Sequence, residues 1–410
     1  MKHLLRALSQ RNFRLYFLGQ SASFVGTWMQ QIALAWLIYR LTGSPFMLGL
    51  TAFAGNIPIL FLAPFGGVWS DRLNRRRAML LTQSLSLLQA AVLAGLTFAG
   101  RIEVWHLLSA ATFLGFVNAF DTPLRQAFLL EMVGSRENLP NAIALNSLMM
   151  NGSRLVGPAL AGVVLAAAGE AWCFLLNAAS YLAMLAALAA MQLPPSPPPR
   201  SGQNWLAGLR EAVHFAWNFK PSRYLIGLVA LVSFVATPYA SLMPVFARDV
   251  LGGDASTLGL LVGASGAGAM AGVLYLAGRR GAAGLERLIA FAGACAGMGL
   301  ILFSQSNTLW LSLAVLPLVG FGIISIAASV NTILQLVAPD AMRGRLVSLH
   351  ITAFLGVMPV GSLVFGLFAE RFGAAAMVTA GGTLCLIGAL RFATRLEVMR
   401  DLLAPHYAQR

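Results

Sequence analysis

Ionisable side chains are rare inside the apolar stretches of this sequence, and three of them are placed to carry or balance a proton. Asp121 and Arg154 lie within long apolar segments, and Arg125 follows Asp121 at the i,i+4 spacing that puts two side chains on one helix face. His350 lies within a later apolar segment, and histidine titrates near neutral pH. Reversible protonation, with exchange of ion-pair partners, is the chemistry that these residue types could support.

Two interpretations of these residues remain open. A charge near mid-membrane costs about 2.5–3.5 kcal/mol on insertion scales, so each needs a partner, a water-filled cavity or a function. Asp121 could exchange between Arg125 and Arg154 and couple binding to movement, or it could form a static ion pair. His350 could titrate, or it could be a hydrogen-bonded packing residue. We expect Asp121 to carry the exchangeable proton, with His350 as the next candidate.

The elements that hold these residues are predicted to be membrane-spanning helices. Of the 410 residues, 58% are hydrophobic and 10% are charged, whereas about a quarter are charged in a soluble domain. Apolar stretches of the length that crosses about 30 Å of hydrocarbon recur along the chain. Twelve spans are expected, near 13–38, 46–69, 78–99, 104–124, 142–168, 172–191, 223–248, 256–277, 287–304, 309–330, 345–369 and 374–394.

The basic residues predict the orientation of these spans. If both termini are cytoplasmic, only four of the 28 Lys and Arg residues lie on the opposite side, namely Arg40, Arg101, Arg248 and Arg371, and Arg154 lies inside a span. This asymmetry follows the positive-inside rule. It also accounts for the net charge of +14 without a nucleic-acid partner. The start of the chain shows no cleavable signal peptide, so the first span is expected to stay in place.

The spans fall into two sets of six. A proline-rich stretch at 194–199 and an amphipathic piece at 205–219 separate them. The segment 133–162 is weakly similar to 337–366 at a constant offset, as parallel internal repeats are. The predicted domains are therefore an N-terminal six-helix bundle at 1–191, a cytoplasmic linker at 192–222 and a C-terminal six-helix bundle at 223–410.

The loop after the second span carries a recognisable motif. The loop matches the pattern Gly-x-x-x-Asp-Arg-x-Gly-Arg-Arg/Lys at Gly67, Asp71, Arg72, Arg75 and Arg76, and Asn74 stands in place of the second glycine of the pattern. The run resembles the cytoplasmic signature of the major facilitator superfamily. The resemblance implies an all-α polytopic membrane protein with twelve transmembrane helices in two six-helix bundles related by pseudo-two-fold symmetry. It also implies that the five residues act in gating, whereas a basic loop that only sets topology is the simpler alternative.

The fifth span contains a proline among small residues. Gly157, Pro158 and Gly162 resemble the Gly-Pro-x-x-Gly-Gly antiporter signature of the superfamily, with Ala161 for one glycine. Proline leaves a carbonyl without its helical donor and kinks the helix, and small residues allow close helix contact. The resemblance implies that Gly157, Pro158 and Gly162 act in gating and that the protein works by efflux in exchange, usually with protons. A packing kink without any directional meaning is the alternative.

Two further stretches, 26–45 and 337–349, resemble the branch that contains enterobactin-type siderophore exporters and related drug exporters. The expected function is export of a small amphipathic molecule across the bacterial inner membrane by proton antiport, in a functional monomer; the alternative is a lysophospholipid transporter of the same fold. If the family's arrangement holds, spans one, four, seven and ten line the cavity, and the candidate cargo contacts are Met29, Gln30, Trp36, Asn118, Tyr239, Met243 and Asn331.

An enzyme and a cofactor-dependent protein are not expected. No nucleophile, base and orienting residue are grouped at one depth, and no Walker-type loop is present. The three cysteines, Cys173, Cys295 and Cys385, show no metal-ligand spacing. Small-molecule cargo, protons and the bilayer are the expected partners.

Overall fold

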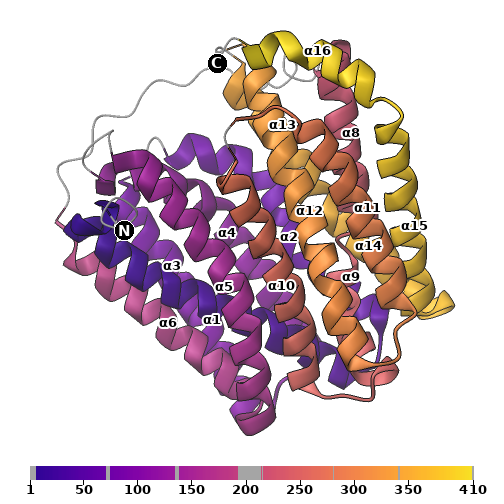
Figure 1. The fold of residues 1–410 in the computed structure, drawn as a ribbon. Coiled ribbons are helices and arrows are strands. Elements are labelled where there is room, and N and C mark those ends of the chain that lie inside the picture. The colour runs from indigo at the N-terminus through magenta and orange to yellow at the C-terminus, as the bar shows by residue number, and fades with distance from the viewer. Residues whose placement is uncertain are drawn as a thin grey trace. The chain divides into compact units, whose positions relative to one another are not determined.

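The computed structural model describes residues 6–70, 74–133, 138–192, 214, 216–279, 281–339 and 342–408. Within these ranges the ordered elements are helices, joined by short loops, and no strand is formed (Figure 1). The chain divides into two compact units, and each is described by itself. Unit 1 comprises Met1–Gly43, Ala54–Gly202 and Gly253–Gly263, and unit 2 comprises Ser44–Phe53, Gln203–Gly252 and Ala264–Arg410.

Unit 1 is built mainly from the first six long helices. α1 packs against α5 and α6, while α3 packs against α4 and α6 (Figure 1). The bounds are α1 Arg11–Thr42, α2 Pro45–Ser70, α3 Arg75–Phe98, α4 Val104–Val133, α5 Leu139–Ala168 and α6 Glu170–Ala190.

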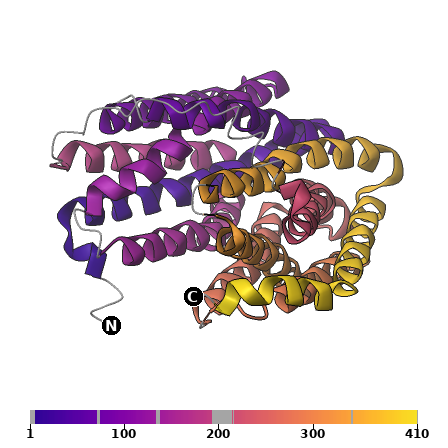
Figure 2. The ribbon, with the colours of Figure 1, turned by 90° about the horizontal axis from the view of Figure 1, so that it is seen from above.

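Unit 2 holds most of the remaining helices. α11 packs against α12 and α15, and α16 packs on α8, α11 and α12 (Figure 2). The bounds are α8 Lys220–Val235, α9 Tyr239–Val245, α10 Ala255–Ala277, α11 Leu285–Ser304, α12 Leu309–Val337, α13 Arg343–Ile351, α14 Val357–Phe372, α15 Ala374–Ala393 and α16 Leu396–Ala408. The first turns of α2 group with unit 2, and the first turns of α10 group with unit 1.

The long helices are of membrane-spanning length and composition. Eleven stretches within the described residues are long and apolar enough to cross a bilayer. α1 is not among them, although its 32 residues exceed the required length, because it carries Arg, Gln, Ser and Thr along much of its length. With α1 the predicted set of twelve is complete. The predicted boundaries of the two domains remain a prediction, since 193–213 lie outside the described residues.

Two predicted spans are interrupted, which the sequence did not indicate. The seventh span, Lys220–Val250, consists of α8, α9 and a π-helical turn, Phe246–Val250. The eleventh span, Arg343–Phe372, contains a second π-helical turn, Thr352–Gly356. A single π turn inserts one residue without changing composition, and such turns are frequent at functional sites.

Local chemistry explains several helix ends. α1 stops at Gly43, whose φ of 62° is left-handed and whose N–H donates to the Tyr39 carbonyl at 2.8 Å. Asn74 caps α3 by accepting from the Arg77 N–H at 3.0 Å. Asp254 lies in the loop before α10, and the hydroxyl of Ser256 donates to its carboxylate at 2.5 Å. This hydrogen bond lowers the pKa of Asp254 below its ordinary value.

The interior contains thiols, while large apolar side chains cover much of the outside. Cys173 and Cys385 are fully buried, and Cys295 is partly buried at the middle of α11. Trp310, at the start of α12, is 82% exposed. In a membrane-spanning protein such outward apolar faces meet lipid, and tryptophan near a helix end suits the membrane interface.

Candidate functional site

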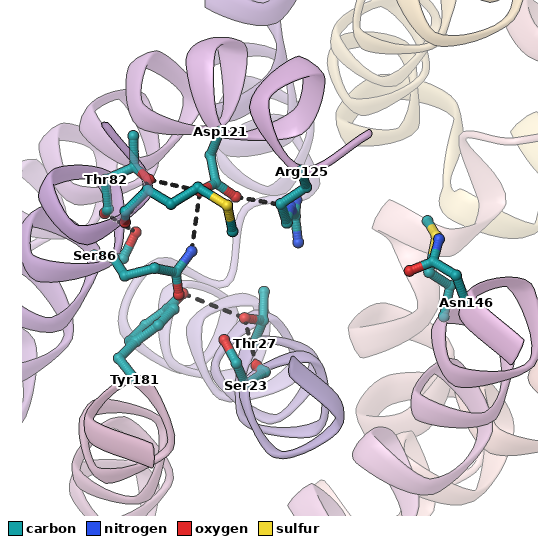
Figure 3. A network of polar contacts seen from close by, with 11 residues as sticks. Ser23, Thr27, Thr82, Ser86, Asp121, Arg125, Asn146 and Tyr181 are labelled. Atoms are coloured by element: carbon teal, nitrogen blue, oxygen red, sulfur yellow. Dashed lines mark hydrogen bonds and ion pairs between the residues drawn. The ribbon is translucent and has the colours of Figure 1, made fainter. Parts of the chain in front are cut away.

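Asp121 is the centre of a buried polar network in unit 1 (Figure 3). One of its carboxylate oxygens accepts from the Thr82 hydroxyl at 2.6 Å and from the Gln83 amide at 3.0 Å. Its other oxygen pairs with Nε of Arg125 at 2.8 Å. The Arg125 guanidinium also lies 4.8 Å from the ring centroid of Phe24 on α1. Helices α1, α3 and α4 therefore meet around the Asp121–Arg125 ion pair.

The donors around Asp121 suit its charged form. A buried carboxylate loses several kcal/mol of hydration unless donors replace the water, and here a guanidinium, a hydroxyl and an amide do so. The amide of Gln83 is used on one side only: Nε2 donates to Asp121, whereas the buried Oε1 has no hydrogen-bond partner among the described residues. An acceptor without a donor is thus held beside the carboxylate.

Hydroxyl groups extend this network across the bundle. The Tyr181 hydroxyl, on α6, lies 3.2 Å from the Thr27 hydroxyl on α1, which donates to the Ser23 carbonyl at 2.8 Å. Ser86 on α3 donates to the carbonyl of Thr82 at 3.0 Å. Figure 3 shows these side chains gathered beside Asp121.

A second buried set consists of amides. Gln30 on α1 donates to Oε1 of Gln89 at 3.0 Å and accepts from Asn177 at 2.8 Å, and Gln89 donates to the Ala110 carbonyl at 3.3 Å. These bonds join α1, α3, α4 and α6. Sequence reasoning selected Gln30 but missed Gln89 and Asn177, although an amide inside an apolar helix is itself a signal that a partner is needed.

Arg154 does not pair with Asp121. Its guanidinium lies 5.6 Å from the ring centroid of Trp28, on α1, and the ion pair of Asp121 is with Arg125. Arg154, one of the two partners that the sequence offered for Asp121, therefore makes a cation–π contact in this structure.

Two of the predicted residues of unit 2 have a buried polar atom without a hydrogen-bond partner among the described residues. His350 is 6% exposed, and its Nδ1 has no partner among the described residues. The Oδ1 atom of Asn331 also has none there. The Tyr239 hydroxyl lies 2.5 Å from the Ser265 hydroxyl, and Met243 is buried.

The other predicted cargo contacts belong to unit 1. Met29 and Gln30 are buried, with both amide atoms of Gln30 already bonded, whereas Trp36 and Asn118 are half-buried. Asn146, another polar residue of a span, contacts the Met150 sulfur of its own helix at 3.8 Å (Figure 3). The predicted cargo residues are thus divided between the two units.

The arginines of the loop motif make bonds within unit 1. Arg75 pairs with Glu131, near the end of α4, at 2.7 Å. Arg76 donates to the carbonyls of Leu188 and Ala189, at the end of α6, at 3.0 and 2.8 Å, where a cation also meets the negative end of the helix dipole. Glu131 was not predicted. Asp71, Arg72 and the surroundings of Gly67 lie outside the described part of the chain.

The glycines of α5 mark two close helix crossings in unit 1. A Cβ atom on Gly157 would lie 2.5 Å from Cβ of Trp28 on α1. A Cβ atom on Gly259 of α10 would lie 2.6 Å from the Pro158 carbonyl and 2.8 Å from Cα of Gly162. Because real Cβ contacts are not this short, only glycine fits at either crossing. Gly259 was not selected from the sequence.

A family model described as transmembrane secretion effector matches residues 4–406. This match spans nearly the whole chain. The protein belongs to this family of the major facilitator superfamily. Among solved structures, a bacterial homologue of the human lysosomal transporter Spinster is similar, with a TM-score of 0.70, 14% identity and 97% of each chain covered. The predicted major facilitator fold is confirmed.

Relatives of this secretion effector family member include exporters and transporters of siderophores and drugs. The staphyloferrin A transporter of Staphylococcus aureus is 24% identical, covering 93% of this chain and 96% of that protein. The enterobactin exporter EntS of Citrobacter koseri is 29% identical, covering 92% and 90%. The multidrug efflux pump Tap of Mycolicibacterium fortuitum is 25% identical, covering 83% and 85%. The present protein, as a member of the same family, is a multi-pass membrane transporter and not an enzyme.

Proposed function

We propose that the protein exports a small amphipathic molecule, a siderophore or a drug-like compound, across the bacterial inner membrane in exchange for protons. Both termini lie in the cytoplasm, and the monomer alternates access between two faces. The observation that carries the proton step is the buried Asp121 carboxylate with donors from α3 and α4. The siderophore and drug transporters related to the chain support the cargo class.

The network around Asp121 has two ways of being satisfied. With the carboxylate charged, Arg125 balances the charge and the Gln83 amide donates. A protonated Asp121 no longer balances Arg125 but gains an O–H donor. Rotation of the Gln83 amide by half a turn would turn the partnerless Oε1 toward that O–H. Proton binding therefore favours a different arrangement of the same side chains, which is the requirement for coupling.

Arg125 links this exchange to helix movement. Its guanidinium also contacts Phe24 on α1, so release of the ion pair changes what holds α4 against α1. In the family's arrangement α1 and α4 border the cargo path. Trp36, Asn118 and Asn331 are half-buried and are the cargo contacts that we favour, together with the buried Met29, Gln30, Tyr239 and Met243.

Transport in proteoliposomes tests the proposal. Vesicles with an imposed pH difference receive labelled catecholate and carboxylate siderophores, fluorescent cationic drugs and, as a separate arm, labelled lysophospholipid. We expect a siderophore or a drug to accumulate against its gradient and to be released by a protonophore. Accumulation of lysophospholipid alone would replace the proposed cargo class, and transport that ignores the pH difference would remove proton antiport. The three relatives described above give the lysophospholipid alternative no support.

The loop motif is proposed to act in gating, and Asp71→Asn tests this. The substitution removes a charge at the membrane edge, where insertion costs little. Transport should fall several-fold while yield stays near wild type, measured as initial rate at equal protein density. Glu103→Gln, which removes an exposed carboxylate before α4, is the matched control. Unchanged transport in Asp71→Asn would leave the motif as a topology signal.

Pro158, inside α5, is proposed to kink this helix and so to serve coupling, and Pro158→Ala tests this. Alanine supplies the N–H that proline lacks, so α5 should straighten near Arg154 and exchange should become slower or leakier. Pro140→Ala is the control, because Pro140 is exposed in the first turn of the same helix, where the N–H has no helical partner. A wild-type rate and proton stoichiometry in Pro158→Ala would show that Pro158 serves helix packing and not coupling.

A further inference from the structure

A cluster of cations and aromatic rings lies where α8 begins and where the chain turns from α15 into α16. The guanidinium of Arg223 lies 5.6 Å from the ring centroid of Tyr224 and 6.0 Å from that of Trp217. The guanidinium of Arg395 lies 5.8 Å from the same Tyr224 ring. Both arginines are exposed, and Trp217 is 67% exposed. We name these four residues the Tyr224 cluster; all belong to unit 2.

The Tyr224 cluster gathers positive charge without an acidic partner. Two guanidiniums share one ring, and neither makes an ion pair with any described residue. The exposed Lys220 adds a further cation at the N-terminus of α8, where the helix dipole is also positive. Both guanidiniums lie beside the same ring and their charges repel each other, so an anion that contacts both would stabilise the arrangement.

A cavity near the Tyr224 cluster is not the binding site for such an anion. It has a volume of about 440 Å³ and is lined by the charged residues Glu286, Arg287, Glu397 and Arg400. Its two carboxylates balance its two guanidiniums, so it has no preference for an anion. Glu397 follows Arg395 by only two residues, but its side chain lines this cavity and is not an ion-pair partner of Arg395.

We propose that the Tyr224 cluster binds the phosphate of an anionic phospholipid from the bilayer that surrounds the protein. Guanidiniums bind phosphate oxygens in pairs of parallel hydrogen bonds, and Arg223 and Arg395 present two such groups over one ring. The cluster lies at the start of a membrane span, Lys220–Val250, which is the depth of lipid headgroups. Exposed tryptophan is enriched at the same depth. The predicted topology assigns the site to the cytoplasmic leaflet.

An arginine that only sets the topology of a membrane protein does not need to lie over an aromatic ring, as Arg223 and Arg395 do. Arg11 and Arg14 on α1 are exposed at the end of the bundle that is predicted to be cytoplasmic, and neither is stacked on a ring of a described residue. They provide a matched pair for comparison: the same residue type, the same exposure and the same loss of two charges.

The test measures lipid binding by the purified full-length protein in detergent, so it depends neither on cargo nor on proton coupling. Dioleoylphosphatidylglycerol is titrated, and bound lipid is counted by native mass spectrometry while the melting temperature is followed. Dioleoylphosphatidylcholine is the uncharged comparison, and inorganic phosphate at millimolar concentration tests for a free-anion site. The variants are Arg223→Gln with Arg395→Gln, and Arg11→Gln with Arg14→Gln.

The double variant of the cluster should bind phosphatidylglycerol about thirtyfold more weakly, which corresponds to about fivefold for each cation. The Arg11/Arg14 control should weaken binding less than about threefold, since these arginines do not belong to the cluster and charges outside it act only through salt-screened electrostatics. Equal weakening by the two double variants would overturn the proposal. So would stabilisation by inorganic phosphate that equals the stabilisation by phosphatidylglycerol.

A third variant separates the geometry from the charge. Tyr224→Leu keeps both arginines but removes the ring on which they stack, so the affinity for phosphatidylglycerol should fall several-fold at unchanged net charge. An unchanged melting temperature in phosphatidylcholine shows that the variant is folded. Wild-type affinity in folded Tyr224→Leu would overturn the proposal as stated.

Discussion

Replacing Asp121 by asparagine is expected to abolish export that is driven uphill by a pH difference, while cargo still exchanges down its gradient. Asparagine has nearly the same shape, and its carbonyl oxygen can accept from Thr82 and Gln83 as the carboxylate does. It cannot bind and release a proton, and it cannot balance the charge of Arg125. The variant therefore separates the carrier of the proton from the path of the cargo.

The measurement compares two modes of transport in the same proteoliposomes. Accumulation under a pH difference should be lost, and counterflow of labelled cargo at equal pH should persist. Asp401→Asn is the control, because it makes the same substitution at an exposed site on α16. Melting temperature and elution volume show whether the Asp121→Asn protein is folded.

Persistence of uphill transport in Asp121→Asn would assign the proton elsewhere. His350 is then the next candidate, because its imidazole is buried and its Nδ1 has no partner among the described residues. In that case the Asp121–Arg125 pair is structural, and His350→Gln should show the transport phenotype described for Asp121→Asn.

Replacing Gly259 by valine is expected to block exchange by forcing α10 away from α5. The first atom of the new side chain would lie 2.6 Å from the Pro158 carbonyl and 2.8 Å from Gly162, both of them backbone atoms. Overpacking of a close contact costs about 1–3 kcal/mol, which shifts a two-state equilibrium by roughly five- to 150-fold. Conformations in which these helices touch should become rare.

Gly263→Val is the matched control for this experiment. Gly263 lies one turn further along α10, and a Cβ atom there would meet only the Leu155 carbonyl, at 3.9 Å. Initial rates at equal protein density should fall at least about tenfold for Gly259→Val and stay within about twofold of wild type for Gly263→Val. Similar rates in both variants would show that the crossing does not change during transport.

The sequence predicts the spans well because their signal is local. A run of apolar residues long enough to cross a bilayer is visible in a single window, as in Leu309–Val337 and Glu170–Ala190. The same holds for Gly157 and Gly162, where small residues follow one another at helical spacing. Such features require no knowledge of which helix lies alongside.

The partners of the polar residues could not be predicted in this way. Gln30 binds Gln89 and Asn177, which are 59 and 147 residues away, and no periodicity links such positions. Arg154 is a second example: the sequence offers both Arg125 and Arg154 as partners of Asp121, and the structure pairs Asp121 with Arg125 and places the Arg154 guanidinium over the Trp28 ring. Choosing between an ion pair and a cation–π contact requires the rotation of α5 about its axis, which composition does not fix.

The buried thiols of Cys173 and Cys385 have a practical consequence for measurements of orientation. A membrane-impermeant maleimide needs water and access to reach a thiol, and these two side chains are fully buried while Cys295 lies at mid-span in α11. The native chain should therefore show almost no labelling background. α1 and α6 run antiparallel, because the end of α1 contacts the start of α6 through Arg40 and Glu170. Arg11 and Trp172 therefore lie at opposite ends of this helix pair. A single cysteine introduced at either position would report from intact cells which end of the bundle faces outward.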